Sequence, residues 1–348
     1  MGSQRFKVGM YGGNFDPPHI GHFKCIIKAA SACEKLYVVL SWAKGRESVP
    51  MELRYRWLLN SFKHMPNIQI LPIEDYAVSK EEYNKSDYWE QGAKAIKDKI
   101  GAPIDAVFCG SDYKGRNRFE PLYSESRIVY FDRSELPISS TQIRSNPLKY
   151  WDYIPQIERG FYTKKILVVG SESTGKTTLV KNLALTYNTN YVEEVGRLTC
   201  EYAGGEEYMV KEDLIENLLK QKIHTDEACK SSNRLLFIDT DAITTLFYIR
   251  LLMDNESERN SYTSLEQLAK SINSLNHWDL VLFIEPVNTF IQDGTRNDEI
   301  RNNREKYSEE LKSLLCKNKV NFERLSGDYN SIYDSATEII SSLFFNNY

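Results

Sequence analysis

The sequence is poor in cysteine and histidine and has no long apolar run. Its six cysteines are scattered, without a CxxC pair or a cysteine–histidine cluster at zinc-binding spacing. No segment approaches the run of about 18 apolar residues that crosses a bilayer, and no apolar signal segment precedes the first strand-like run. We therefore expect a reduced, cytoplasmic chain with no membrane partner, no disulfide framework and no zinc site.

A large net charge is also missing. The chain has 44 Lys and Arg residues against 48 Asp and Glu residues, a formal net charge of -4. A charge so near zero produces no global field that attracts polyanions, so we expect no nucleic-acid partner. The 41% hydrophobic and 26% charged residues are typical of folded globular proteins. At 348 residues the chain is long enough for two cores.

Strand-like and helix-like patterns alternate along the first half. Short apolar runs predict strands at residues 6–11, 36–42, 68–73, 106–109 and 127–131. Amphipathic patterns between them predict helices at residues 21–32, 52–63 and 88–100. Strands that alternate with helices indicate a doubly wound parallel sheet.

The alternation stops at residues 145–163, which include Pro147 and Pro155, and then starts again. Further strands are predicted at residues 165–169, 190–192, 235–239 and 280–284, and long polar helices at residues 211–231 and 301–317. We therefore predict an α/β protein with two doubly wound parallel-sheet domains, residues 1–160 and residues 161–348.

A phosphate-binding motif opens the second predicted domain. Residues 170–177 read GSESTGKT, which satisfies GxxxxGK[ST], and they lie between a strand-like run and a helix-like run. Glycines let the backbone wrap phosphate oxygens, the lysine reaches the outer phosphates and the hydroxyl residue ligates Mg²⁺. The predicted nucleotide-binding residues are Gly170, Ser173, Thr174, Gly175, Lys176, Thr177 and Thr178.

Acidic and basic residues after later strands could complete this site. Asp239 ends an apolar strand, where a carboxylate can hold Mg²⁺ together with Thr177. Glu194 could orient or deprotonate an acceptor hydroxyl, and Arg197 could hold a phosphate. A solvated helix start explains these two residues equally well. Arg296 belongs to a DGTR segment that suits a mobile lid closing on the transferred phosphoryl group.

The first domain carries a different motif. Two of the five histidines, His19 and His22, lie within four residues on a glycine-rich loop that follows a strand and starts a helix. We call residues 12–22 the histidine loop. Adenylyl transfer mainly requires two phosphorylated partners to be positioned and spreading negative charge to be stabilised, and imidazole N–H donors beside backbone amides can do this.

Residues 138–144, which we call the serine–arginine segment, read ISSTQIR. Ser140 and Thr141 open a short helical stretch and Arg144 lies one turn further on. Hydroxyl groups and a guanidinium at a helix start form an anion-binding corner. Alone the segment could be a plain helix cap, but together with the histidine loop in one domain it indicates a second nucleotide site.

The histidine loop and the serine–arginine segment resemble the GxFxPxHxGH and ISSTxIR signatures of the nucleotidyltransferase superfamily, in particular nicotinamide-mononucleotide adenylyltransferases. With the motifs of the second half, the whole chain resembles the NadR-type bifunctional enzymes, in which an adenylyltransferase precedes a P-loop ribosylnicotinamide kinase. Some members of that family begin with a helix-turn-helix repressor domain. Here the first strand begins within ten residues, so we expect no repressor role.

The resemblance implies a reaction for each half. The kinase would transfer the γ-phosphoryl group of ATP to nicotinamide riboside, with Mg²⁺ as cofactor, giving nicotinamide mononucleotide (NMN). The adenylyltransferase would then convert NMN and ATP into NAD and pyrophosphate. It further implies an ATP site at Gly12, Gly13, Phe15, His19, His22, Ser140, Thr141 and Arg144, and a kinase site at Lys176, Glu194, Asp239 and Arg296.

Three further residues are weaker candidates for nucleotide contacts. Lys44 and Arg46 could add phosphate contacts, although a solvated loop explains them as well, and Asp112 could meet a ribose or a base. Other interpretations stay open at this stage: nicotinate mononucleotide or pantetheine phosphate as the acceptor, a P-loop domain that only senses nucleotides, and, third, a DNA-binding regulator. The sequence does not fix the oligomeric state, and a homo-oligomer is compatible with it.

Overall fold

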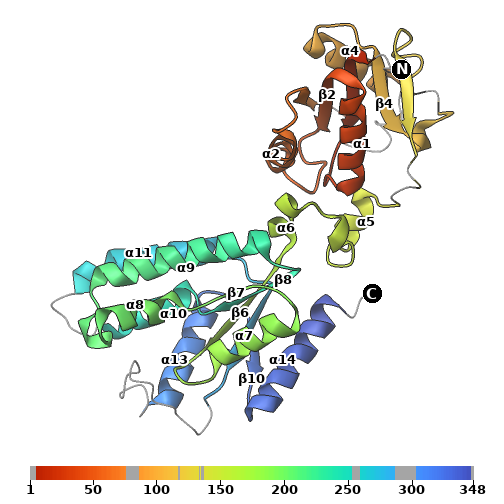
Figure 1. The fold of residues 1–348 in the computed structure, drawn as a ribbon. Coiled ribbons are helices and arrows are strands. Elements are labelled where there is room, and N and C mark those ends of the chain that lie inside the picture. Colours follow the sequence, from red (N-terminus) through yellow and green to blue (C-terminus); the bar gives the residue numbers. More distant parts are fainter. Residues whose placement is uncertain are drawn as a thin grey trace. The chain divides into compact units, whose positions relative to one another are not determined.

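The computed structural model describes residues 5–75, 86–116, 118–132, 134, 137–252, 259–286 and 303–345. The chain divides into two compact units, Met1–Glu158 and Arg159–Tyr348, which we call the first and second units. Each unit has its own sheet and its own apolar cores (Figure 1).

The first unit is built on a parallel sheet of five strands in the order β3-β2-β1-β4-β5. Its strands are β1 (Phe6–Gly13), β2 (Cys33–Trp42), β3 (Ile68–Glu74), β4 (Ala106–Gly110) and β5 (Arg127–Phe131), and its helices are α1 (Ile20–Ser31), α2 (Met51–Phe62), α4 (Ser86–Ile100) and α5 (Ser140–Ser145).

Successive side chains of a strand point to opposite faces of its sheet, and the first unit uses both faces. Tyr11 of β1 packs in a cluster with residues of α1 and α2, whereas the preceding Met10 packs with residues of α4. The sheet is therefore covered on both sides, and only its edges and the loops at its strand ends reach solvent.

The second unit is also a five-stranded parallel sheet, in the order β10-β9-β6-β8-β7. Its strands are β6 (Lys164–Gly170), β7 (Tyr191–Val192), β8 (Leu235–Asp239), β9 (Leu280–Ile284) and β10 (Glu323–Leu325). Its helices are α7 (Lys176–Thr186), α8 (Val195–Ala203), α9 (Lys211–Ser231), α10 (Ala242–Leu252), α11 (Arg259–Leu275), α13 (Arg304–Lys317) and α14 (Tyr329–Phe344).

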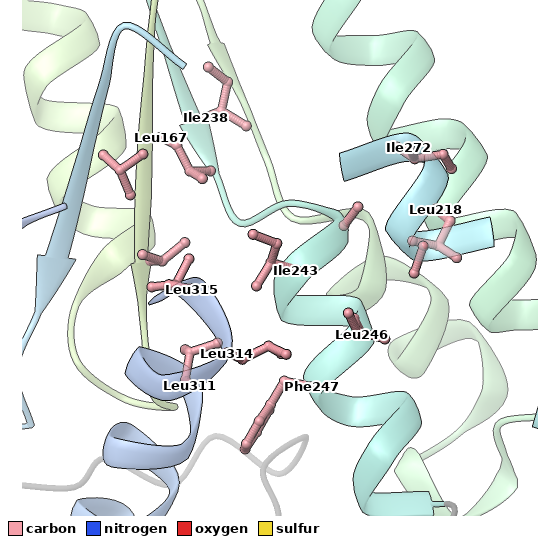
Figure 2. Close-up of a cluster of buried hydrophobic side chains, with 14 of the residues drawn as sticks. Leu167, Leu218, Ile238, Ile243, Leu246, Phe247, Ile272, Leu311, Leu314 and Leu315 are labelled. Carbon is pink, nitrogen blue, oxygen red and sulfur yellow. The ribbon is translucent and has the colours of Figure 1, made fainter. Parts of the chain in front are cut away.

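The larger core of the second unit lies between the sheet and helices α9, α10, α11 and α13. Figure 2 shows Leu311, Leu314 and Leu315 of α13 near Ile243 and Phe247 of α10. On the other face, residues of α7 and α14 pack against Ile166 and Val168 of β6. Strand β6 is thus buried on both sides, which explains why its sequence is an unbroken apolar run.

The predicted fold class is confirmed, because both halves are doubly wound parallel sheets. One local expectation was wrong. Residues 145–163 were predicted to be irregular, but they include the short helices η3 (Trp151–Tyr153) and α6 (Gln156–Tyr162). Pro155 immediately precedes α6, where its fixed φ favours a helix start instead of breaking one. Among the described residues, no helix is long and apolar enough to cross a membrane.

The core of the second unit gives a first prediction. Leu315 is fully buried, and Leu315→Ala should lower the free energy of unfolding of this unit by about 2–5 kcal/mol because it leaves a cavity. Leu275→Ala is the matched control, because Leu275 is 68% exposed. Thermal unfolding followed by circular dichroism measures both; equal midpoints for the two variants would contradict the assignment of Leu315 to the core.

Candidate active sites

The histidine loop connects β1 to α1 and places its two histidines against each other. His19 is the N-cap of α1, and its Nδ1 accepts a hydrogen bond of 3.3 Å from the backbone N–H of His22. The two imidazole rings stack with centroids 3.7 Å apart. Gly21 lies between them, and a Cβ at this position would come within 2.9 Å of His19 Nδ1. Glycine is therefore required for this pairing of the rings.

Phe15 supports the loop from the core side. It is 2% exposed, has a φ of 48°, and its ring lies edge-on to that of His22 with centroids 5.0 Å apart. A side chain at Gly13 would come within 3.3 Å of the same ring. Gly13 and Phe15 thus shape the loop that holds the histidines, and neither needs a ligand to explain its position.

The serine–arginine segment lies directly on the histidine loop, although more than 120 residues separate them in sequence. Ser140 Oγ donates a 2.8 Å hydrogen bond to the carbonyl of Pro17. Arg144 donates to the carbonyl of Asp16 and to Thr141 Oγ1, and it lies 3.5 Å from the Asp16 carboxylate. The structure therefore joins the two motifs that the sequence predicted to form one site.

An open cleft borders the histidine loop. Its lining includes both histidines, two lysines of α1, one aspartate, and apolar side chains of β1, β5 and the serine–arginine segment: Tyr11, His19, His22, Lys24, Lys28, Phe131, Asp132 and Ile138. Imidazole and ammonium groups beside an aromatic wall suit a ligand with an anionic part and a flat ring.

The three weaker candidates of the first unit have different environments. Lys44 is exposed on the loop after β2. Arg46 forms ion pairs of 2.5 Å with both Glu47 and Asp75, so its charge is already compensated. Asp112 follows β4, which is the neighbour of β1, and is exposed at the carboxyl edge of the sheet.

The P-loop of the second unit begins where β6 meets β9. A Cβ on Gly170 would lie 2.7 Å from the carbonyl oxygen of Ile284, so no side chain fits there. Gly175 has a φ of 90°, which residues with a side chain rarely adopt. Lys176 Nζ donates a 3.1 Å hydrogen bond to the carbonyl of Ser171, which folds the lysine over its own loop.

Asp239 and Thr177 come together at the end of this loop. Thr177 Oγ1 donates a 2.5 Å hydrogen bond to Asp239 Oδ2, while Asp239 Oδ1 is buried and has no hydrogen-bond partner among the described residues. Burial raises the pKa of Asp239, and Lys176 and Thr177 act in the opposite direction. A hydroxyl oxygen and a carboxylate oxygen that converge in this way fit Mg²⁺, which prefers hard oxygen ligands.

The neighbouring acids Glu193 and Glu194 have different environments. Glu193 is 42% exposed and pairs with Lys181 at 2.6 Å. Burial, followed by the charge of Asp239, raises the pKa of Glu194 to about 7, and Lys176 opposes this shift. A carboxyl with a pKa near neutrality is suited to accept a proton. Glu194 therefore belongs to the same electrostatic centre as Asp239 and Lys176, whereas Glu193 is partly exposed and its charge contributes less than burial does to the raised pKa of Asp239.

The remaining candidates of the second unit are less central. Arg197 is 43% exposed and pairs with Glu201 one turn along α8. Arg304, at the start of α13, donates to the carbonyls of Glu172 and Ser173 in the P-loop. Asp241 caps α10 by accepting from the backbone N–H of Ile243. Arg296 lies outside the described residues.

Comparisons with known proteins agree with this division. The cytidylyltransferase-like family matches residues 10–146, and the AAA domain family matches residues 165–331. The trifunctional NAD biosynthesis/regulator protein NadR of Escherichia coli (strain K12) is 28% identical over 355 residues, which cover 98% of this chain and 84% of that protein. The chain is thus similar to NadR over almost its whole length. The family resemblance inferred from the motifs is thereby confirmed.

Solved NadR structures share the fold along the whole chain. A crystal structure of a NadR protein in complex with NR has a TM-score of 0.82 at 24% identity, covering 98% of this chain and 97% of that one. Another, in complex with NAD and AMP-PNP, has a TM-score of 0.81 at 24% identity and covers 97% and 96% of the two chains. The chain thus shares the fold of these NadR proteins, and its two units match the cytidylyltransferase-like and AAA domain families.

Sequence reasoning missed two buried ionic residues beneath the histidine loop, Asp16 and Arg54. The Asp16 carboxylate accepts hydrogen bonds from the backbone N–H groups of Ser48 and Val49. Arg54 of α2 is 1% exposed, donates to the carbonyl of Asn14 and lies 3.5 Å from Glu47. The only sequence signal was that Arg54 shares its helix face with the buried Leu58, four residues further on.

Arg54 gives the second prediction. Arg54→Met should destabilise the first unit by about 1–3 kcal/mol, because the carbonyl of Asn14 loses a buried donor and Glu47 loses one of its two arginine partners. Arg56→Met is the control on the same helix, because Arg56 is exposed. The thermal unfolding midpoint of the first unit is the measurement, and the proposed support of the loop would be wrong if both variants matched the parent protein.

Proposed function

We propose that the chain catalyses two consecutive steps of NAD biosynthesis. The second unit phosphorylates nicotinamide riboside with ATP to give NMN, and the first unit transfers the adenylyl group of a second ATP to NMN, giving NAD and pyrophosphate. In domain terms, residues 1–160 are the adenylyltransferase and residues 161–348 the kinase. The observation that carries the proposal is the presence of two separate sites, each at the carboxyl edge of its own parallel sheet.

The relatives support this assignment. The E. coli relative is described as a trifunctional NAD biosynthesis/regulator protein, and solved NadR proteins hold NR in one case and NAD with AMP-PNP in another. NR is the substrate of the first proposed step, and NAD is the product of the second. AMP-PNP is an analogue of ATP, the nucleotide that both steps use.

In the proposed kinase reaction, the backbone N–H groups of residues 170–175 and Lys176 bind the phosphates of ATP. Thr177 and Asp239 hold Mg²⁺, which neutralises phosphate charge when bound. Glu194 accepts the proton of the riboside 5′-hydroxyl as that oxygen attacks the γ-phosphorus and ADP leaves. Its raised pKa supports this role, because a weakly acidic carboxyl holds the proton more readily than an ordinary one.

In the proposed adenylyl transfer, a phosphate oxygen of NMN attacks the α-phosphorus of ATP and pyrophosphate leaves. His19 and His22 donate hydrogen bonds to the phosphate oxygens on which negative charge develops. Arg144 has five N–H donors and uses some of them on Asp16 and Thr141, so that it can orient the triphosphate from the opposite side of the loop.

The third prediction separates the two activities. The protein is incubated with nicotinamide riboside, ATP and Mg²⁺, and NMN and NAD are both followed by chromatography. Lys176→Ala should lower NMN formation by at least about 10²-fold and spare the conversion of added NMN to NAD. His22→Ala should have the opposite effect. Each variant serves as the folding control for the other.

Two results would contradict the assignment. One is a single substitution that abolishes both activities in folded protein, because two independent sites could not respond in this way. The other is adenylation of nicotinate mononucleotide or pantetheine phosphate in preference to NMN, which would change the acceptor. ATP that binds but is never turned over would indicate a nucleotide sensor.

The fourth prediction concerns the proton acceptor. Glu194→Gln should lower kcat for riboside phosphorylation by about 10²–10⁴-fold, because the amide cannot accept the proton. Glu193→Gln is a closely matched control, since Glu193 is the preceding residue, is 42% exposed and pairs with Lys181. Its kcat should stay within about threefold of the parent value, as expected for loss of an exposed ion pair. Equal losses in the two variants would exclude Glu194 as the specific base.

A further inference from the structure

In the second unit, little backbone pairing connects the segments that carry Glu194 and Asp239. Strand β7 has two residues, and its pairing with β8 ends at Val192 and Ile238. Glu194 and Asp239 both lie beyond the last residues that pair between β7 and β8. Because the backbone pairing of β7 with β8 stops before these two acids, another interaction must fix the distance between the segments that carry them.

Gln221 of α9 makes this connection. Its side chain is 8% exposed, and its Oε1 accepts a 3.0 Å hydrogen bond from the backbone N–H of Val195, the residue after Glu194. Its Nε2 donates to the carbonyl of Asp239 at 3.2 Å and to that of Thr240 at 3.3 Å. A side-chain amide offers the same donor and acceptor types as a peptide group. Gln221 therefore continues the β7–β8 connection past the end of β7.

The backbone that Gln221 holds on the β8 side is in an unfavourable conformation. Thr240 has a φ of 61°, in the left-handed region that a β-branched residue rarely occupies. Its backbone N–H donates a 3.1 Å hydrogen bond to the carbonyl of Val168 in β6, and its carbonyl accepts from Gln221. Such conformations persist only where surrounding contacts enforce them. Without Gln221, one of the contacts that fix the turn after Asp239 would be lost.

We propose that Gln221 is a positioning residue for phosphoryl transfer, which sets the separation between the Glu194 and Asp239 carboxylates through the backbone that carries them. This inference rests on the proposed kinase activity of the second unit. Gln221 contacts neither carboxylate group, so it acts through their main chains. Phosphoryl transfer depends almost entirely on positioning and charge stabilisation, so a displaced acid costs rate more than nucleotide affinity.

The test is Gln221→Met in the full chain. Methionine has a similar length but neither donates nor accepts at this position. We expect kcat for riboside phosphorylation to fall by about 10²-fold, the loss typical of a misplacement near 1 Å. The KM for ATP should stay within about twofold, because the hydrogen bonds of the Gln221 side chain go to Val195, Asp239 and Thr240 and, among the described residues, none reaches the P-loop. Adenylation of added NMN by the first unit should be unchanged.

Asn217→Ala is the matched structural control. Asn217 lies one turn before Gln221 on α9, is 5% exposed, and its Oδ1 accepts a 2.5 Å hydrogen bond from Thr199 of α8. Asn217 thus joins α9 to α8, as Gln221 does through Val195, but its hydrogen bond does not extend to β8. We expect this variant to lose thermal stability and keep kcat within about threefold, as expected for an interaction remote from the reacting groups.

A second variant covers the case in which Gln221→Met fails to fold. Gln221→Glu keeps the shape of the side chain and the acceptor for Val195 but, as a carboxylate, cannot donate to the Asp239 and Thr240 carbonyls. It should also lower kcat with little change in the KM for ATP. The inference is overturned if Gln221→Glu, or folded Gln221→Met, keeps the parent kcat, or if Asn217→Ala lowers kcat equally. A parent protein without riboside kinase activity would instead overturn the proposed function.

Discussion

Both sites depend on one constraint: the chain must leave a buried central strand through a loop that has no room for side chains. In the second unit, Gly170 ends β6 so close to β9 that a Cβ would lie 2.7 Å from a carbonyl oxygen. In the first unit, a Cβ on Gly21 would come within 2.9 Å of His19. Because side chains are excluded at these points, backbone N–H groups and a few selected donors can approach a phosphate closely. The strands themselves contribute only rigidity, through apolar packing on both faces.

This rigidity extends unevenly to the functional groups. The histidine loop is fixed from several directions, by the Phe15 ring, by Ser140 and by the Asp16–Arg144 pair. In the second unit, the P-loop follows the central strand β6, but Glu194 follows the two-residue strand β7 and stands at the sheet margin. An acid on a weakly paired edge needs support from outside the sheet. The buried amide of Gln221 is suited to that role, because leaving the polar groups that it contacts without partners would be costly.

Motif-bearing positions were predictable from the sequence, because their physics is local. The alternation of apolar runs and helices predicted both sheets, and the GxxxxGKT pattern specified a strand, a loop and a helix that the structure contains. What could not be predicted was set by contacts between distant residues. Nothing near Arg54 or Gln221 in sequence indicates that they contact Asn14 or Asp239. Glu193 and Glu194 were also indistinguishable in sequence, because only the folded chain places one in an ion pair with Lys181 and the other where burial and the charge of Asp239 raise its pKa to about 7. The short helix α6 was missed because Pro155 was interpreted as a residue that breaks the pattern, whereas in the structure it immediately precedes the helix.

The difference between the two sites follows from the nucleophiles that they are proposed to activate. A phosphate monoester is already anionic at neutral pH, so an adenylyltransferase acting on NMN needs donors and no base. The contacts of the first unit agree with a site that has donors and no base. Both histidines line the cleft. The Asp16 carboxylate already accepts from the N–H groups of Ser48 and Val49 and pairs with Arg144. A riboside hydroxyl must lose a proton as it attacks, and the second site places a weakly acidic Glu194 beside Lys176 and Asp239. The protonation state of the acceptor therefore explains why one sheet edge carries imidazoles and the other carboxylates, although both bind the same nucleotide.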